Sequence, residues 1–287
     1  MSTGSPPTPL EAGRLEELAE LLSGRRVVAL SGAGCSTESG IPDYRGPTSA
    51  RRSRSPVRYQ EFMARPEARR RYWARSFFGW PSFAGARPNA AHRALADLEA
   101  EGVVVGVITQ NVDGLHQAAG TRSFVELHGS LSRVQCMGCR ADLPRDGFQE
   151  LLESSNPDYR AGPGPLAPDG DADVTPEESA FRVPDCDRCG GILKPDVVFF
   201  GESVPAETLE RSWRLYETGD VLLVLGSSLE VFSGRRFVLR ASKEAKPLAV
   251  VNAGPTRADP VARVKIDGRL GDVIPRLAGA LRVGSRV

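Results

Sequence analysis

The sequence has no apolar run long enough to cross a lipid bilayer, which takes about 20 residues in a helix. Residues 1–25 also lack the charged start and the apolar stretch of a secretory signal. Positive and negative charges are also nearly balanced, and a net charge of +1 gives no general attraction to nucleic acid or to an anionic membrane. We therefore expect a cytoplasmic protein that binds neither membrane nor nucleic acid, and we expect it to act as a monomer.

Cysteine is also sparse, with five in 287 residues. Four of them form two C-x-x-C pairs, Cys136 with Cys139 and Cys186 with Cys189, which suits a reducing compartment better than a disulfide scaffold does. Each pair can place two sulfurs on one tight turn, and two such turns complete a closed tetrahedron around Zn2+. We predict a structural zinc ion, because a closed shell leaves no position for substrate or water. Coincidental pairs, or a redox pair as in thioredoxin, are the alternatives.

A long segment separates the two cysteine pairs. Residues 154–185 are dense in proline, glycine and aspartate, which is typical of a long loop. Its alternating aspartates begin like a calcium loop, but Val174 and Ala180 stand where that loop requires glycine and glutamate. We expect a solvated acidic loop, and the sequence assigns no role to it.

The hydrophobic residues, 40% of the chain, follow two alternating patterns. Short apolar runs predict buried strands at 27–30, 103–109, 221–226 and 248–252. Segments with helical period lie at 90–101, 206–218, 234–242 and 270–281, and Thr8 is the expected cap of a further N-terminal helix. This alternation predicts an α/β fold with a doubly wound parallel sheet, in which ligands bind at the carboxyl ends of the strands.

Two stretches interrupt the alternation. Residues 47–87 are rich in arginine and aromatics, and residues 131–199 contain the four paired cysteines. We assign both stretches to a smaller lobe that is helical and binds zinc. The remaining residues, 1–46, 88–130 and 200–287, form the predicted domain with the parallel sheet.

A glycine turn at 32–36 directly follows the first predicted strand. Because glycine lacks a Cβ, the backbone amides of such a turn can approach a diphosphate closely. Thr37 stands where a dinucleotide-binding dehydrogenase requires glycine or alanine, and proline and glycine in the next tract, 40–46, prevent a continuous helix. The turn alone therefore indicates a phosphate-binding loop with a flexible cover over its ligand.

Several motifs occur in a fixed order along the chain. They are Gly32-Ala33-Gly34-Cys35-Ser36, Gly40-Ile41-Pro42-Asp43-Tyr44-Arg45-Gly46, Thr109-Gln110-Asn111-Val112-Asp113-Gly114-Leu115-His116, Glu126-Leu127-His128-Gly129 and the four cysteines. Together they resemble the signature of the sirtuins, which are NAD-dependent protein lysine deacylases. Tyr44, Tyr72-Trp73-Ala74-Arg75 and the tract 194–202 are similar to the class II branch of that family.

The resemblance implies a Rossmann-like sheet and a reaction that consumes NAD. Nicotinamide is released, and the acyl group of a lysine in a protein substrate is transferred to ADP-ribose as 2'-O-acyl-ADP-ribose. By the same resemblance, Gln110 and Arg45 orient the ribose and phosphates, and Tyr44 shields the reacting carbon from water. The implied NAD contacts are Gly32, Ala33, Gly34, Ser36, Asp43, Tyr44, Arg45, Gln110, Asn111, Asp113, Gly226, Ser227, Ser228, Asn252, Ala253, Gly254 and Leu270, the last standing where the family commonly has cysteine.

His128, Asn111 and Asp113 are the catalytic candidates. A base that titrates near neutrality must take a proton from a ribose hydroxyl, and His128 offers an imidazole directly after the strand-like segment 124–127. The alternative for His128 is a structural histidine, the interpretation we keep for the other two histidines. Asn111 can hold the ribose or an attacking water. Asp113 can accept a hydrogen bond from the nicotinamide carboxamide, or it caps a turn.

An extended peptide held between two backbone segments presents its lysine without much sequence readout. By resemblance these segments contain Val198, Phe199, Phe200, Gly201 and Glu202 on one side and Leu229, Glu230 and Val231 on the other. Tyr72 and Arg75 have a spacing that recognises acidic acyl chains in some class II relatives, and an arginine fork suits a carboxylate. The alternative is that both residues serve packing and solvation on a helix face. The preferred acyl chain and the substrate protein stay open.

Two other functions use the same residues. Mono-ADP-ribosylation directs the activated ribose to a protein nucleophile, and a non-catalytic scaffold binds zinc and NAD without turnover. The presence of His128, Asn111 and Asp113 argues against a scaffold.

Overall fold

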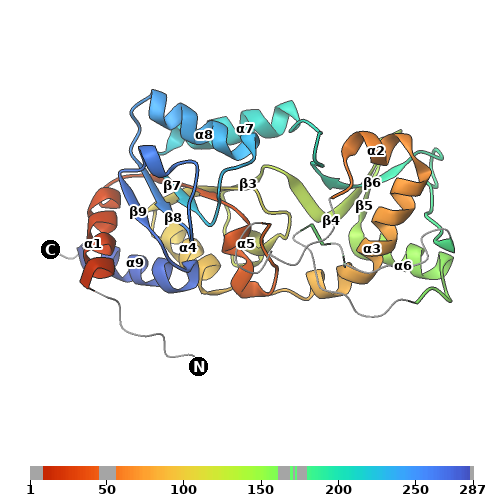
Figure 1. The fold of residues 1–287 in the computed structure, drawn as a ribbon, viewed down its shortest axis with the longest axis horizontal. Helices are drawn as coiled ribbons and strands as arrows, with labels where there is room; N and C mark the ends of the chain where they lie inside the picture. Colours follow the sequence, from red (N-terminus) through yellow and green to blue (C-terminus); the bar gives the residue numbers. More distant parts are fainter. Residues whose placement is uncertain (1–8, 45–55, 161–168, 171, 173–179, 285–287) are drawn as a thin grey trace.

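The computed structural model describes residues 9–44, 56–160, 169, 170, 172 and 180–284 (Figure 1). Its larger part is a six-stranded parallel sheet in the order β3-β2-β1-β7-β8-β9. The strands are β1 (Val27–Ser31), β2 (Val104–Thr109), β3 (Phe124–Glu126), β7 (Val221–Leu225), β8 (Leu248–Val251) and β9 (Val264–Ile266). Every residue of the central strands β1 and β7 is buried, because both faces of the sheet are covered. The predicted doubly wound parallel sheet is confirmed.

Helices cover both faces of this sheet (Figure 1). On one face, α1 (Pro9–Leu22), α4 (Ala90–Ala100) and α9 (Leu270–Gly284) share a core with Ala29 of β1. On the other face, α7 (Ala206–Thr218) and α8 (Phe232–Lys243) pack with Val28 of β1. Successive side chains of a strand point to opposite faces, so β1 supplies both cores.

A second sheet, antiparallel and three-stranded, lies at the other end of the molecule (Figure 1). Its order is β5-β4-β6, with β4 (Gly129–Cys136), β5 (Asp142–Pro144) and β6 (Leu193–Val197). Around it lie α2 (Tyr59–Ala64), α3 (Pro66–Ala84) and α6 (Arg145–Ser155). Aromatic side chains fill the core between these elements, and the rings of Trp73 and Phe148 are 4.6 Å apart.

Short turns make up the rest of the regular structure. The glycine turn after β1 forms two 3-10 turns, η1 (Ala33–Cys35) and η2 (Thr37–Ser39), and Gly40 ends the second with φ at 85°. A continuous helix is therefore absent there, as expected from the sequence. The helix α5 (Leu115–Ala118) follows β2, and η4 (Asp259–Val261) precedes β9.

The predicted strands agree with β1, β2, β7 and β8 to within one residue at each end. The helix predicted at 234–242 begins two residues earlier, at Phe232, and α9 continues to Gly284. The sequence analysis did not predict β9 or the strands of the small sheet. The predicted cap Thr8 lies outside the described residues, and within them no helix is both long and apolar enough to span a membrane.

Candidate functional site

The loops after β1 and β7 touch at the carboxyl edge of the parallel sheet. Gly32 N donates to Leu225 O and Gly34 N donates to Gly226 O, each at 2.9 Å. A Cβ on Gly32 would lie 2.7 Å from the Cβ of Ser227, and one on Gly34 would lie 2.9 Å from the Cα of Gly226. The contact between the two loops therefore requires glycine at both positions. The sequence analysis explained these glycines by the approach of a ligand and did not predict this contact.

Polar side chains from three loops form one hydrogen-bonded network at this edge. Ser36 Oγ donates to Asp113 Oδ2 at 2.6 Å, and Asn111 Nδ2 donates to Ser36 Oγ and to Gly32 O, both at 3.1 Å. Beside them Gln110 Nε2 donates to Ser227 Oγ at 2.8 Å. Six of the predicted NAD contacts thus lie together, and the amide, hydroxyl and carboxylate groups of their side chains match the hydroxyls and carboxamide of a dinucleotide.

Asp113 caps a turn, the alternative role that the sequence offered, and it also joins the polar network. Leu115 N donates to its Oδ1 at 2.9 Å, so the carboxylate caps the turn that leads into α5. Its other oxygen accepts from Ser36 within the polar network. Burial raises the pKa of Asp113, and the hydrogen bonds from Ser36 and Leu115 oppose this shift.

His128 lies two residues beyond the end of β3, with both ring nitrogens engaged. Nδ1 is 2.8 Å from Gln110 O, and Nε2 is 2.7 Å from Ser233 Oγ. A carbonyl oxygen only accepts, so Nδ1 carries the proton and Nε2 presents its lone pair. Burial lowers the pKa of His128, and the charge of Arg236 lowers it further, while the bond to Gln110 opposes both. The ring is therefore neutral near pH 7.

The other two histidines form a separate buried group with Cys35. The Cys35, His92 and His116 ligand atoms lie within 4.8 Å of one another. Asn89 N donates to His92 Nδ1 at 3.4 Å, so a neutral His92 carries its proton on Nε2 and offers no lone pair there; the group does not fit a metal ion. Burial lowers the pKa of His92 to about 4 and that of His116 to about 3, so both rings are neutral and structural.

The four paired cysteines converge at the far end of the small sheet. Their sulfurs lie within 4.8 Å of one another, and the cluster fits a structural zinc site. Sulfurs from different pairs lie close together: Cys136 Sγ is 3.5 Å from Cys189 Sγ, and Cys139 Sγ is 3.8 Å from Cys186 Sγ. The backbone N–H of Cys139 donates to Cys136 Sγ and lowers the pKa of Cys136 to about 6, which favours the thiolate. One convergent cluster of four sulfurs argues against coincidental pairs.

The first predicted substrate segment runs beside His128. Val198 N donates to His128 O at 2.9 Å, and Phe199 N donates to Glu202 Oε2 at 2.8 Å. Glu202 is also paired with Lys194, whose ammonium lies 3.0 Å away and is nearly fully buried. In the second segment, Leu229 is buried and has φ at 59°, a left-handed conformation that is uncommon for leucine.

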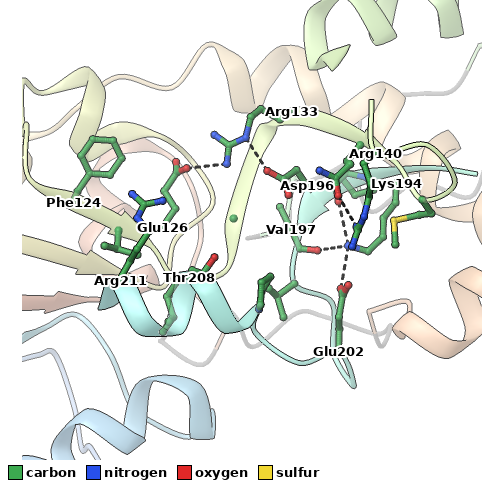
Figure 2. Close-up of a pocket in the computed structure, with 18 of the residues that line it drawn as sticks. Phe124, Glu126, Arg133, Arg140, Lys194, Asp196, Val197, Glu202, Thr208 and Arg211 are labelled. Carbon is green, nitrogen blue, oxygen red and sulfur yellow. Dashed lines mark hydrogen bonds and ion pairs between the residues drawn. The ribbon is translucent and has the colours of Figure 1, made fainter. Parts of the chain in front are cut away.

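A pocket of about 330 Å³ opens between the two sheets (Figure 2). Glu126, Arg133, Lys194 and Glu202 line it, together with the backbone that follows β6. Arg133 reaches Glu126 Oε2 at 3.1 Å and Asp196 Oδ2 at 2.8 Å, as Figure 2 shows. This guanidinium therefore ties β3 of the parallel sheet to β6 of the small sheet.

Tyr72 and Arg75 both lie on α3. The Tyr72 ring is 5.1 Å from that of Phe199 and 5.6 Å from that of Phe62, so it is part of the aromatic core of the small lobe. It also contacts a residue of the first predicted substrate segment. Recognition of an acidic acyl chain by this pair stays a prediction.

The remaining predicted NAD contacts are more dispersed. Tyr44 is half exposed, with its ring 6.1 Å from that of Phe200, and Arg45 lies outside the described residues. Asn252 Nδ2 donates to Ala253 O and Gly254 O, each at 3.0 Å, and closes the turn after β8. The sequence analysis missed Ser233, and the only signal was a hydroxyl residue just before the helix predicted at 234.

Comparison with known proteins defines the class of protein. The Sir2 family model matches residues 32–233, and the chain belongs to this family. NAD-dependent protein deacetylase 1 of Streptomyces coelicolor is 50% identical over 274 residues, which cover 95% of this chain and 91% of that protein. The NAD-dependent protein lipoamidase sirtuin-4, mitochondrial, of Bos taurus is 44% identical over 275 residues, 94% of this chain and 87% of that one. A solved structure named Sir2-p53 peptide-NAD+ has 32% identity and a TM-score of 0.75, covering 95% of this chain and 99% of that chain.

Proposed function

We propose that this protein is an NAD-dependent protein lysine deacylase that transfers an acyl group from lysine to ADP-ribose. Membership of the Sir2 family supports the reaction class, and relatives of both bacterial and animal origin are named as enzymes of this type. The observation that carries the proposal is the state of His128. Its neutral ring presents the Nε2 lone pair next to a polar network suited to a dinucleotide.

The proposed NAD site is the network at the edge of β1, β2 and β7. Asn111, Ser36 and Gln110 offer amide and hydroxyl groups to the ribose, and the glycine turn lies beside them. When bound, NAD supplies an anomeric carbon that becomes electrophilic as nicotinamide leaves. The carboxylate of Asp113 accepts from the carboxamide of that leaving group in place of its present bond to Ser36.

His128 is the proposed general base. The imidazole accepts a proton from a ribose hydroxyl at Nε2, while Gln110 O holds the Nδ1 proton and so fixes the ring orientation. Burial keeps the ring neutral at the outset, so it is ready to accept a proton without first losing one.

The acylated lysine enters between the two substrate segments in the proposed complex. Val198 is bonded through its backbone to His128, so a peptide strand laid along the first segment lies beside the base. The buried pair of Lys194 with Glu202 holds the turn at the end of this segment. These contacts support a substrate read mainly through its backbone.

We also propose the remaining assignments made from the sequence. The zinc ion has a structural role, because four cysteine ligands leave no open position. Residues 47–87 and 131–199 form the small lobe. The cytoplasm is the proposed location, and the bovine relative is named as mitochondrial, so fractionation of cells that express this chain tests the point.

The activity test follows the products. Purified protein is incubated with NAD and lysine peptides that bear acetyl, lipoyl, succinyl, glutaryl or methylglutaryl groups, and nicotinamide and the peptide mass are measured. We expect nicotinamide release that requires an acylated peptide, with loss of the acyl mass from that peptide. A gain of ADP-ribose mass on a protein target, or no nicotinamide release with any peptide, contradicts the proposal. A preference for the acidic chains that Arg75→Met abolishes would support the Tyr72 and Arg75 prediction.

A further inference from the structure

Ser233 is a polar residue in contact with the proposed base. It is the second residue of α8 and is partly buried. Its Oγ is 2.7 Å from His128 Nε2, the nitrogen that must receive the substrate proton. Because Nδ1 holds the ring proton, Nε2 can only accept, and the Ser233 hydroxyl is the donor.

We propose that Ser233 is a positioning residue that occupies Nε2 in the free enzyme and is displaced by the ribose hydroxyl during the reaction. The inference rests on the proposed function. While Ser233 donates to Nε2, the ring is held in the tautomer with its proton on Nδ1. The ribose hydroxyl then binds an imidazole whose tautomer and orientation the protein has already fixed.

The position of Ser233 is fixed by its neighbour in α8. A Cβ on Gly234 would come within 2.3 Å of Gln110 Oε1, so the first turn of the helix lies directly against the Gln110 side chain. The carbonyl of the same Gln110 accepts the Nδ1 proton of His128. Gln110, His128 and the first turn of α8 therefore form a closed set of contacts, which places the backbone of Ser233 beside Nε2.

Ser233 can be substituted without changing the charged groups around His128. From α8, the guanidinium of Arg236 acts on the ring. The carboxylates of the adjoining segments have other partners: Asp113 is bonded to Ser36, Glu126 to Arg133 and Glu202 to Lys194. None of these partners is altered by a change at position 233.

The Ser233 hydroxyl donates to Nε2 of the neutral ring, and it accepts from Nε2–H once the ring is protonated. The second bond is charge-assisted and is the stronger of the two, so loss of the hydroxyl disfavours the protonated ring. Without the hydroxyl, as in Ser233→Ala, we expect the pKa of His128 in the free enzyme to fall by about half a unit to one unit, the value of one ordinary hydrogen bond. Ser233→Thr keeps the donor at the same place and should keep the wild-type value. Ser242→Ala, an exposed serine near the other end of α8, is the matched control.

Histidine NMR tests this without turnover. The chain has three histidines, so substitution is needed to assign the signals of the His128 ring. Zinc-loaded full-length protein is titrated, with His128→Gln for assignment. A downward shift in Ser233→Ala that Ser233→Thr lacks supports the proposal. An unchanged pKa in Ser233→Ala, or the same shift in Ser233→Thr, overturns it.

Steady-state kinetics test whether the ribose hydroxyl displaces Ser233 from Nε2 of His128. The pH dependence of kcat/KM reports the free enzyme and that of kcat reports the complex. In Ser233→Ala we expect the acid limb of kcat/KM to move to lower pH while the acid limb of kcat stays in place, because the ribose hydroxyl has replaced Ser233 there. Equal movement of both limbs would show that Ser233 stays on Nε2, and this would overturn the displacement. If no acylated peptide is turned over, the proposed function fails, and the NMR result still decides the role of Ser233 in the free enzyme.

Discussion

The six-stranded sheet and the three-stranded sheet are stabilised in different ways. In the larger sheet, aliphatic strands such as β1 and β7 are buried on both faces between helices, which requires no ligand. The smaller sheet has an aromatic core around Trp73 and a four-cysteine cluster at its far end. We therefore expect the larger region to fold without a ligand and the small lobe to depend on its metal, and the predictions below test that contrast.

Removal of the metal is expected to have the largest effect, and the effect should be local. A structural zinc ion contributes on the order of 10 kcal/mol to folding in small zinc domains. After chelation, or in Cys136→Ser, amide hydrogen exchange should accelerate in β4, β5 and β6 while β1 and β7 stay protected. Cys35→Ala, at a cysteine outside the cluster, should retain zinc and its protection pattern. Uniform exchange across both sheets after chelation would show that the larger sheet also depends on the metal.

Loss of the imidazole at 128 should abolish most of the activity and spare both sheets. His128→Ala removes the proposed base, a role that contributes about 10²- to 10⁴-fold to the rate. Binding of NAD, measured by calorimetry, and zinc content should stay near those of the wild type. A variant that also loses NAD binding and melts at a much lower temperature would indicate a structural histidine instead.

Two tryptophan-to-alanine substitutions compare the core of the small lobe with a core of the larger region. Trp73 is fully buried against Phe148, and its indole donates to Leu193 O, so Trp73→Ala should lower the free energy of unfolding by about 3–5 kcal/mol. Trp213 on α7 is only partly buried, and Trp213→Ala should have a smaller effect. Urea denaturation of both variants measures the difference, and an equal loss would contradict the greater dependence of the small lobe on its aromatic core.

Acid should weaken the larger region through its buried histidine pair. His92 and His116 have folded pKa values of about 4 and about 3, below the ordinary 6.5, so the unfolded chain takes up protons first as the pH falls below 6.5. Each ring then lowers the free energy of unfolding by about 1.4 kcal/mol per pH unit down to its folded pKa. His116→Gln should reduce that slope between pH 6 and pH 4.5. An unchanged slope would mean that the ring is protonated in the native state.

The smallest effect is expected at the link between the two regions. Arg133 bridges Glu126 and Asp196, but its side chain is 44% exposed, so solvent screens both ion pairs. Arg133→Gln should lower the free energy of unfolding by at most about 1 kcal/mol. A loss of several kcal/mol in urea denaturation would show that this guanidinium holds the two sheets together.

The structural features that the sequence predicted differ physically from those that it did not predict. The strands β1, β2, β7 and β8 of the larger sheet are largely apolar runs, so the pattern of apolar residues predicted their positions. The strands β5 and β9 have three residues each and include a charged residue, so no such run marks them. The glycines at 32 and 34 were explained by ligand approach, and their contact with the loop after β7 depends on strand order, which no local pattern encodes. Ser233 was missed for a similar reason, since its partner is more than 100 residues away in the chain.

The strand β4 starts at Gly129, next to the proposed base, and ends at Cys136, the first cysteine of the cluster. One strand thus connects the residue next to the proposed base with the first cysteine of the proposed zinc site. Damage to the thiolates by an oxidant would loosen the cysteine end of the strand and, through the same covalent chain, disturb the alignment of the imidazole. Redox conditions in the cell would then influence turnover without any oxidant entering the catalytic edge.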